Sequence, residues 1–151
     1  MGFVLAVHAL SGKYCTVRSS RVTLAREMWE ATQEGGAEAA LAMAEPQVEW
    51  IFHVAQGRTF RSDELLEFLT QYEGDRDILY GRLYSVRERD LLVVSSGSFR
   101  LTGPDGITEH QIHFVAEFDS DDKLLRVRSY PTAAAAAEAA GLDAQQQSGN
   151  A

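Results

Sequence analysis

The feature of this chain that most constrains its fold is a series of β-type segments in its C-terminal half. Each segment is rich in β-branched and aromatic residues, and polar turn sequences separate the segments. The clearest turn has the sequence GPDG at 103–106, because proline presets a turn angle while glycine and aspartate tolerate left-handed backbone. Consecutive strands joined by such turns predict an antiparallel meander, with strands at 78–87, 91–102, 107–118 and 124–130.

The N-terminal half carries helical signals. Apolar residues recur at three- and four-residue spacing after Ser20, until the flexible pair Gly35-Gly36. Ahead of a later apolar stripe, Ser62 offers a hydroxyl that is typical of a helix N-cap, and Thr132 does the same for an alanine-rich segment near the C-terminus. These signals predict helices at 20–36, 37–44, 62–74 and 133–140, with one short buried strand at 48–54.

Three helices and a strand followed by a meander predict one α+β domain, with the helices gathered on one face of the sheet. A sheet that curls around its helices leaves a cavity, which is the usual place for a small ligand. We divide the chain into an N-terminal extension of unassigned order at 1–20, the domain at 21–142, and a polar tail at 143–151 that we expect to be disordered.

Composition excludes several classes of partner. The chain has 22 Asp and Glu against 14 Lys and Arg, and a formal net charge of -8 repels phosphate backbones and anionic lipids. We therefore expect no nucleic-acid and no membrane partner. The single cysteine excludes an internal disulfide and a multi-cysteine metal site. Residues 3–10 are apolar but lack a positive leading segment, so a cytoplasmic location is expected.

The order of segments and several stretches of sequence resemble the nuclear transport factor 2-like superfamily, and within it the SnoaL-like polyketide cyclase group. The clearest match is the ending, in which Phe118 precedes an acidic turn, a strand with arginines ends at Tyr130, and AAAAEAAGL follows at 134–142. The opening helix that ends in two glycines and the strand that begins at Val48 are also similar. The resemblance covers residues 21–142, although Asp122 replaces the glycine of the family's turn.

The resemblance implies a cone-shaped, strongly curved, mostly antiparallel sheet of the cystatin-like type, with three N-terminal helices around a pocket. It implies a hydrophobic small molecule as ligand, no cofactor, and a homodimer paired through the outer face of the sheet. The function implied is a cofactor-independent isomerase, cyclase or hydrolase that acts by proton transfer on a carbonyl or epoxide compound. A non-catalytic, dimeric ligand-binding or scaffold domain is the alternative, favoured because Pro131 and Thr132 stand where the family's cyclases have an acid.

Four residues are the candidates for catalysis. In relatives the first strand often ends in His or Asp near the pocket, so His53 is either a proton carrier or a strand histidine satisfied by its surroundings. In the strand at 107–118, the face with His110 and Phe114 is expected to be core. If the other face is concave instead, Glu117 is a base and His113 orients it; otherwise both lie on a solvated or dimer-facing surface. Tyr130 is either a hydrogen-bond donor to the ligand or a packing residue.

Three aromatic residues are candidates for ligand contact, namely Trp50, Tyr80 and Tyr84, although each is also a natural packing residue. The spacing His110-x-x-His113 does not predict a metal site. On a strand, side chains three residues apart point to opposite faces, so the two rings cannot share an ion.

Overall fold

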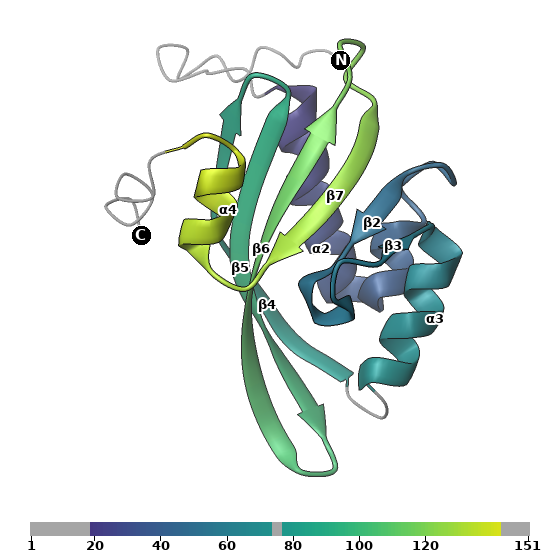
Figure 1. Cartoon of the computed structure of the whole chain (residues 1–151). Coiled ribbons are helices and arrows are strands. Elements are labelled where there is room, and N and C mark those ends of the chain that lie inside the picture. The colour runs from purple at the N-terminus through teal and green to yellow at the C-terminus, as the bar shows by residue number, and fades with distance from the viewer. Residues whose placement is uncertain (1–18, 74–76, 143–151) are drawn as a thin grey trace, which may run out of the picture.

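The computed structural model describes residues 19–73 and 77–142. Figure 1 labels the elements along the chain. The helical elements are α2 (Ser20–Leu41), the short 3-10 turn η2 (His53–Ala55), α3 (Ser62–Glu73) and α4 (Ala133–Ala139). The strands are β2 (Glu49–Ile51), β3 (Thr59–Phe60), β4 (Asp77–Arg89), β5 (Leu92–Gly103), β6 (Gly106–Phe118) and β7 (Leu124–Tyr130).

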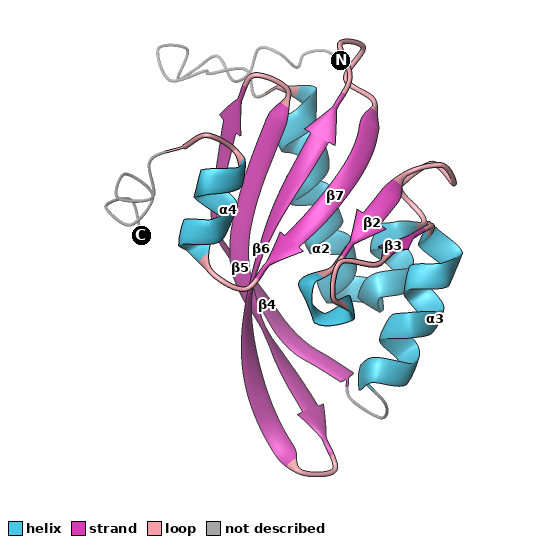
Figure 2. Cartoon of the chain, viewed as in Figure 1, coloured by secondary structure: helices cyan, strands magenta, loops and turns pink. Residues whose placement is uncertain are grey.

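The strands form one sheet in the order β3-β2-β7-β6-β5-β4. Strands β4 to β7 are a continuous antiparallel meander, and β2 joins its edge in parallel with β7. Register shifts in β4 and near the end of β6 bend the strands, because a bulge adds local twist and curvature. The sheet curls strongly around its helices (Figures 1 and 2), so the α+β, cone-shaped fold predicted from the sequence is confirmed.

The two faces of the sheet carry separate hydrophobic cores. Helices α2 and α3 cover the concave face, where Trp50, Leu65 and Val127 belong to the larger core. Helix α4 packs on the opposite face, where Ala136 and Val94 belong to a smaller one. Figure 1 shows α2 and α4 on opposite sides of the meander. Any hollow inside the cone is therefore bounded by α2, α3 and the concave face.

Two details of the helices differ from the prediction. The expected first and second helices form one element with a kink at Gly36, whose φ of 79° only glycine adopts readily. Ser62 is the first residue of α3 and not its N-cap, and its hydroxyl accepts a hydrogen bond of 3.0 Å from the indole Nε1 of Trp50. The carboxylate of Glu64 accepts from the Arg61 amide instead and satisfies the helix start. Thr132 caps α4 as predicted.

Asp122, which stands in place of the family's turn glycine, fastens α2 to the sheet. Its φ of 64° is left-handed, a conformation that aspartate tolerates better than most residues. Ser20 donates a hydrogen bond of 2.8 Å to its carboxylate, and Arg21 pairs with both Asp122 and Glu88. The Ser20 hydrogen bond and, after it, the charge of Arg21 hold the pKa of Asp122 below its usual value. The start of α2 is thus anchored at the far end of the meander.

Candidate functional site

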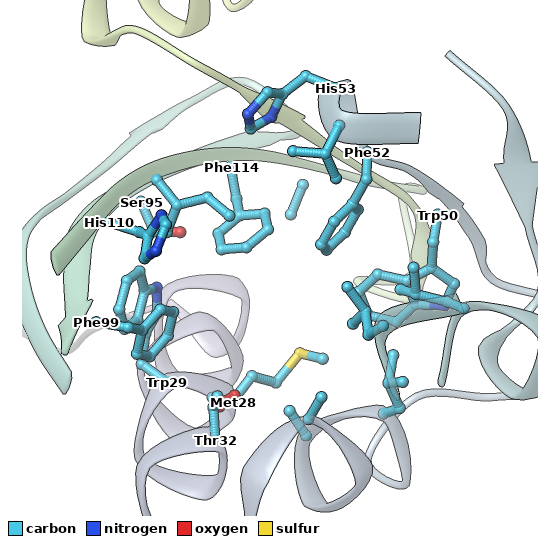
Figure 3. Close-up of a pocket in the computed structure, with 18 of the residues that line it drawn as sticks. Met28, Trp29, Thr32, Trp50, Phe52, His53, Ser95, Phe99, His110 and Phe114 are labelled. Atoms are coloured by element: carbon cyan, nitrogen blue, oxygen red, sulfur yellow. The ribbon is translucent and has the colours of Figure 1, made fainter. Parts of the chain in front are cut away.

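A cavity of about 230 Å³ lies inside the cone. Its walls come from α2 and α3, from the segment around β2 and η2, and from the concave faces of β5 and β6. Figure 3 shows the hollow, with Met28 and Thr32 on the helical side and Phe114 and Phe52 on the other side. The cavity thus lies where the family resemblance places a pocket.

Four aromatic rings form a connected wall around this hollow. The rings of Trp29 and Phe99 stack with their centroids 4.7 Å apart and an interplanar angle of 18°. Phe114 meets Trp29 edge-on at 6.2 Å, and Phe52 lies 5.6 Å from Phe114. Such contacts fix ring orientations beyond what burial alone achieves. The wall therefore offers flat, preorganised apolar surface.

Few polar side chains reach the cavity. Among the described residues that line it, none is Asp, Glu, Lys or Arg. The Thr32 hydroxyl donates to the carbonyl of Met28, and the indole N–H of Trp50 donates to Ser62, so neither donor is free for a ligand. The polar side chains that remain at the wall belong to His53, Ser95 and His110, because Gln111 shares the outer face of β6 with His113.

His53 is held at the point where β2 passes into η2. Its amide N–H donates to the Oγ of Ser129 at 2.9 Å, and its ring Nδ1 lies 2.7 Å from the same oxygen. Ser129 is only 2% exposed, so this hydroxyl has a fixed partner. When the hydroxyl accepts from the amide and donates to Nδ1, the proton of the neutral ring lies on Nε2. Burial lowers the pKa of His53, which favours that neutral ring.

The face of β6 that lines the cavity is the apolar one, with Ile112, Phe114 and Ala116. His113 and Glu117 lie on the outer face and do not line the cavity. His113 is 6% exposed, and its Nδ1 lies 2.8 Å from the Oγ of Ser96. Burial, and then the nearby charge of protonated His53, lower the pKa of His113.

Glu117 forms an ion pair with Arg126 at 2.9 Å on the outer face of the sheet. The same guanidinium reaches Glu49 at 2.9 Å, so Arg126 bridges two partly exposed carboxylates. Glu117 is therefore not placed to act as a base inside the cavity, and His113 does not orient it there.

The remaining candidates are divided between the cavity and the outer face. Trp50 lines the cavity. Tyr130 packs in the small core beneath α4. Tyr84 is 44% exposed, and its hydroxyl lies 2.8 Å from the Oγ of Ser98. Tyr80 belongs to β4, but its side chain lies outside the described residues.

The sequence analysis did not single out Trp29, Phe99, Phe114 and His110, all of which line the cavity. Trp29 was part of a helical stripe, and Phe114 belonged to a face assigned to the core. Core and cavity wall have the same apolar pattern in a sequence, so only a positional signal could have separated them. His110 was the available signal, because a titratable residue on an otherwise apolar face is unusual.

The structure adds two observations on other kinds of site. Within residues 19–73 and 77–142, no three His, Cys, Asp or Glu side chains lie close enough together to hold a metal ion. In the same part of the chain, no helix has the length and apolar character needed to span a membrane.

We expect stability to fall as the pH decreases through the histidine range. His53 and His113 both have folded pKa values below the ordinary 6.5, so the unfolded chain binds more protons there. The free energy of unfolding is thus greatest above this range and is lost as the pH falls toward the folded values. Urea unfolding between about pH 8 and about pH 5.5 measures this slope.

Two variants provide the comparison for that pH slope. His113→Asn retains a group that can bond the Ser96 hydroxyl but removes the titration, so it should reduce the slope. His110→Gln removes a histidine that is exposed and serves as the control. An undiminished slope in His113→Asn would show that this histidine does not carry the effect.

Comparison with known proteins rests on structure alone. No model of a protein family and no curated protein sequence matches the chain. An NTF2-like protein of unknown function from Burkholderia pseudomallei K96243 is similar in structure, with a TM-score of 0.59 and 20% identity over 82% of this chain and 98% of that one. A SnoaL-like polyketide cyclase, so described, from Shewanella denitrificans OS-217 has a TM-score of 0.56 and 17% identity over 74% and 90%. TerC, co-crystallised with polyporic acid, has a TM-score of 0.56 and 21% identity over 80% and 97%.

Proposed function

From the nuclear transport factor 2-like fold that the chain has, we propose that this protein binds a small, flat, hydrophobic molecule inside the cone. The observation that carries the proposal is the cavity of about 230 Å³ with its wall of four aromatic rings. A cavity of about 150 Å³ suffices for benzene, and drug-sized ligands use about 300 Å³ or more. The volume therefore suits a ligand with one or two fused rings.

The polar character of the wall indicates an uncharged ligand. Burying a charge without a partner costs more free energy than the contacts of one small ligand supply. The described lining residues include no carboxylate, ammonium or guanidinium. Hydrogen bonds can come from His53, His110 and Ser95. A neutral ring system with a carbonyl or hydroxyl group fits these donors and acceptors.

The two histidines suggest where the polar groups of such a ligand lie. Ser129, the partner of His53, is opposite Phe114 in the sheet, and His110 stands four residues from Phe114 along β6. At about 3.4 Å per residue, His110 is roughly 14 Å along β6 from the position of Phe114. A bicyclic molecule with polar groups at opposite ends spans this length once both hydrogen bonds are included.

Proton transfer on a carbonyl compound is the second candidate function, and the His53–Ser129 pair favours it. A neutral imidazole whose Nδ1 is held by a buried hydroxyl can donate from Nε2 to a carbonyl oxygen at the wall. The cavity supplies no carboxylate base from its described residues. Simple binding is for this reason the first proposal, and catalysis would depend on His53.

Binding can be measured without a label. The chain has two tryptophans, Trp29 and Trp50, and both line the cavity. We expect 2-naphthol and 2-tetralone to quench their fluorescence. At 100 times Kd a ligand stabilises by about 2.7 kcal/mol, so the Tm should rise by about 5–10 °C. The anion 2-naphthalenesulfonate is the control, and it should neither quench the tryptophan fluorescence nor raise the Tm.

The same samples distinguish the two functions. If 2-tetralone incorporates deuterium next to its carbonyl in heavy water, and His53→Ala abolishes this while leaving binding intact, the protein transfers protons. If it binds without exchange, it is a binding protein for such molecules. Absence of both quenching and thermal shift with every neutral bicyclic probe would contradict the proposed function.

A further inference from the structure

A second cavity, also of about 230 Å³, borders the Trp29 side chain. It is lined by Arg26, Glu30 and Gln33 of α2 and by residues of β4. Trp29 is the one residue, among those described, that lines both cavities. The indole therefore stands between an aromatic hollow inside the cone and a space between α2 and the sheet.

Trp29 is held firmly in this position. It is 8% exposed, it stacks on Phe99 at 4.7 Å, and its outer ring lies directly over Gly97, where no side chain intervenes. Figure 3 shows its ring beside Phe99 at the border of the hollow. A ring that stacks on Phe99, meets Phe114 edge-on and lies against Gly97 does not swing aside at little cost, so it acts as a fixed wall.

The two cavities differ in chemistry. The first is apolar and free of charged lining residues, whereas Arg26, Glu30 and Gln33 supply donors and acceptors to the second. A neutral amide, which both donates and accepts, suits a guanidinium, a carboxylate and an amide side by side.

We propose that Trp29 is the specificity-determining residue that limits ligand length, and that the second cavity is a latent polar subsite which becomes continuous with the first when the indole is removed. The inference rests on the proposed function, since it concerns the same ligand. With Trp29 in place, the protein accepts a flat bicyclic core and rejects a core extended toward α2 and β4. Without the indole, it accepts the core together with a polar tail.

The test compares two probes by calorimetry. One is 2-naphthol, and the other is 2-naphthol extended from its far ring by a three-carbon chain that ends in a primary amide. The wild-type protein should bind the short probe at least about tenfold more tightly than the long one. Trp29→Ala should bind the long probe at least about tenfold more tightly than the short one, because the amide tail can then enter the second cavity.

Two further variants serve as controls. Met28→Ala enlarges the first cavity from the same helix but does not border the second, so the order of the probes should stay as in the wild type. Trp29→Phe retains a ring and should also keep that order. If Trp29→Ala does not fold, Trp29→Leu is measured instead. Leucine keeps apolar bulk but leaves the position of the outer indole ring empty, so this variant should also reverse the order of the two probes.

The possible outcomes separate this inference from the proposed function. Wild-type protein that binds both probes equally, or a folded Trp29 variant that binds 2-naphthol but gains nothing for the long probe, overturns the role of Trp29 and leaves the binding function standing. Failure of every variant to bind either probe overturns the binding function itself, and the inference with it.

Discussion

Replacing Gly97 by alanine is expected to destabilise the protein by roughly 2–4 kcal/mol and to displace Trp29 from the cavity wall. A Cβ at this position would lie 2.3 Å from the backbone oxygen of Arg82 and 2.5 Å from Cη2 of Trp29. The oxygen belongs to the neighbouring strand, which is paired with β5 at Leu83 and Gly97, so it cannot retreat without disturbing the pairing. The contact with Arg82 would therefore strain the strand pairing, and the indole would also have to move, which would lose its stacking on Phe99.

Urea unfolding gives the free-energy change, and near-ultraviolet circular dichroism reports the packing of Trp29. Gly81→Ala is the matched control on the adjacent strand, because its Cβ would come no nearer than 3.0 Å to the ring of Phe99. A shift of a few tenths of an ångström relieves that contact, so a much smaller loss is expected. A Gly97→Ala protein with unchanged unfolding midpoint and unchanged aromatic dichroism would show that Trp29 does not lie against this glycine.

The fold could be predicted because its determinants are local. The turn at 103–106 and the apolar alternation of the segments around it specify antiparallel hairpins without reference to the rest of the chain. The glycine pair Gly35-Gly36 was also visible in the sequence, but the sequence did not show that it would kink the helix without ending it. A glycine pair can end a helix or bend it, and packing of the continuation on the sheet decides which happens.

The candidate site could be predicted only in part, because its contacts join distant residues. His53 contacts Ser129, which is 76 residues away in the sequence, and no local sequence pattern predicts that pairing. The alternation in β6 separated two faces correctly but did not say which one is concave. That choice depends on the curvature of the sheet, so His113 and Glu117 were candidates for a wall to which they do not belong.

Trp29 illustrates a different limit. Its spacing in α2 indicates a buried side chain, and it is buried, but burial against a cavity and burial in a solid core leave the same pattern. The distinction arises from volume that neighbouring side chains leave unfilled. Small residues contribute to that volume, and Ala37, Ala40 and Ala116 all line the cavity.

Substitution of Ala116 by leucine is expected to weaken the binding of 2-naphthol by at least about 100-fold while leaving the free energy of unfolding unchanged or raising it by about 0.5–2 kcal/mol. Ala116 lies on β6 between Val93 and Val127 of the two neighbouring strands, so its backbone is fixed and the added carbons must project into the cavity. Filling apolar space adds dispersion contacts that the empty cavity lacks. The same carbons occupy the volume that the ligand needs.

Calorimetry with 2-naphthol and urea unfolding on the same preparation separate the two effects. Ala139→Leu on the exposed side of α4 is the control, and it should alter neither quantity appreciably. Undiminished binding by Ala116→Leu would place the ligand outside the cone. Loss of binding together with gained or retained stability would mean that the unfilled volume contributes nothing to folding, since a larger side chain serves the fold at least as well. The alanine at this position would then be explained by the ligand that the cavity holds.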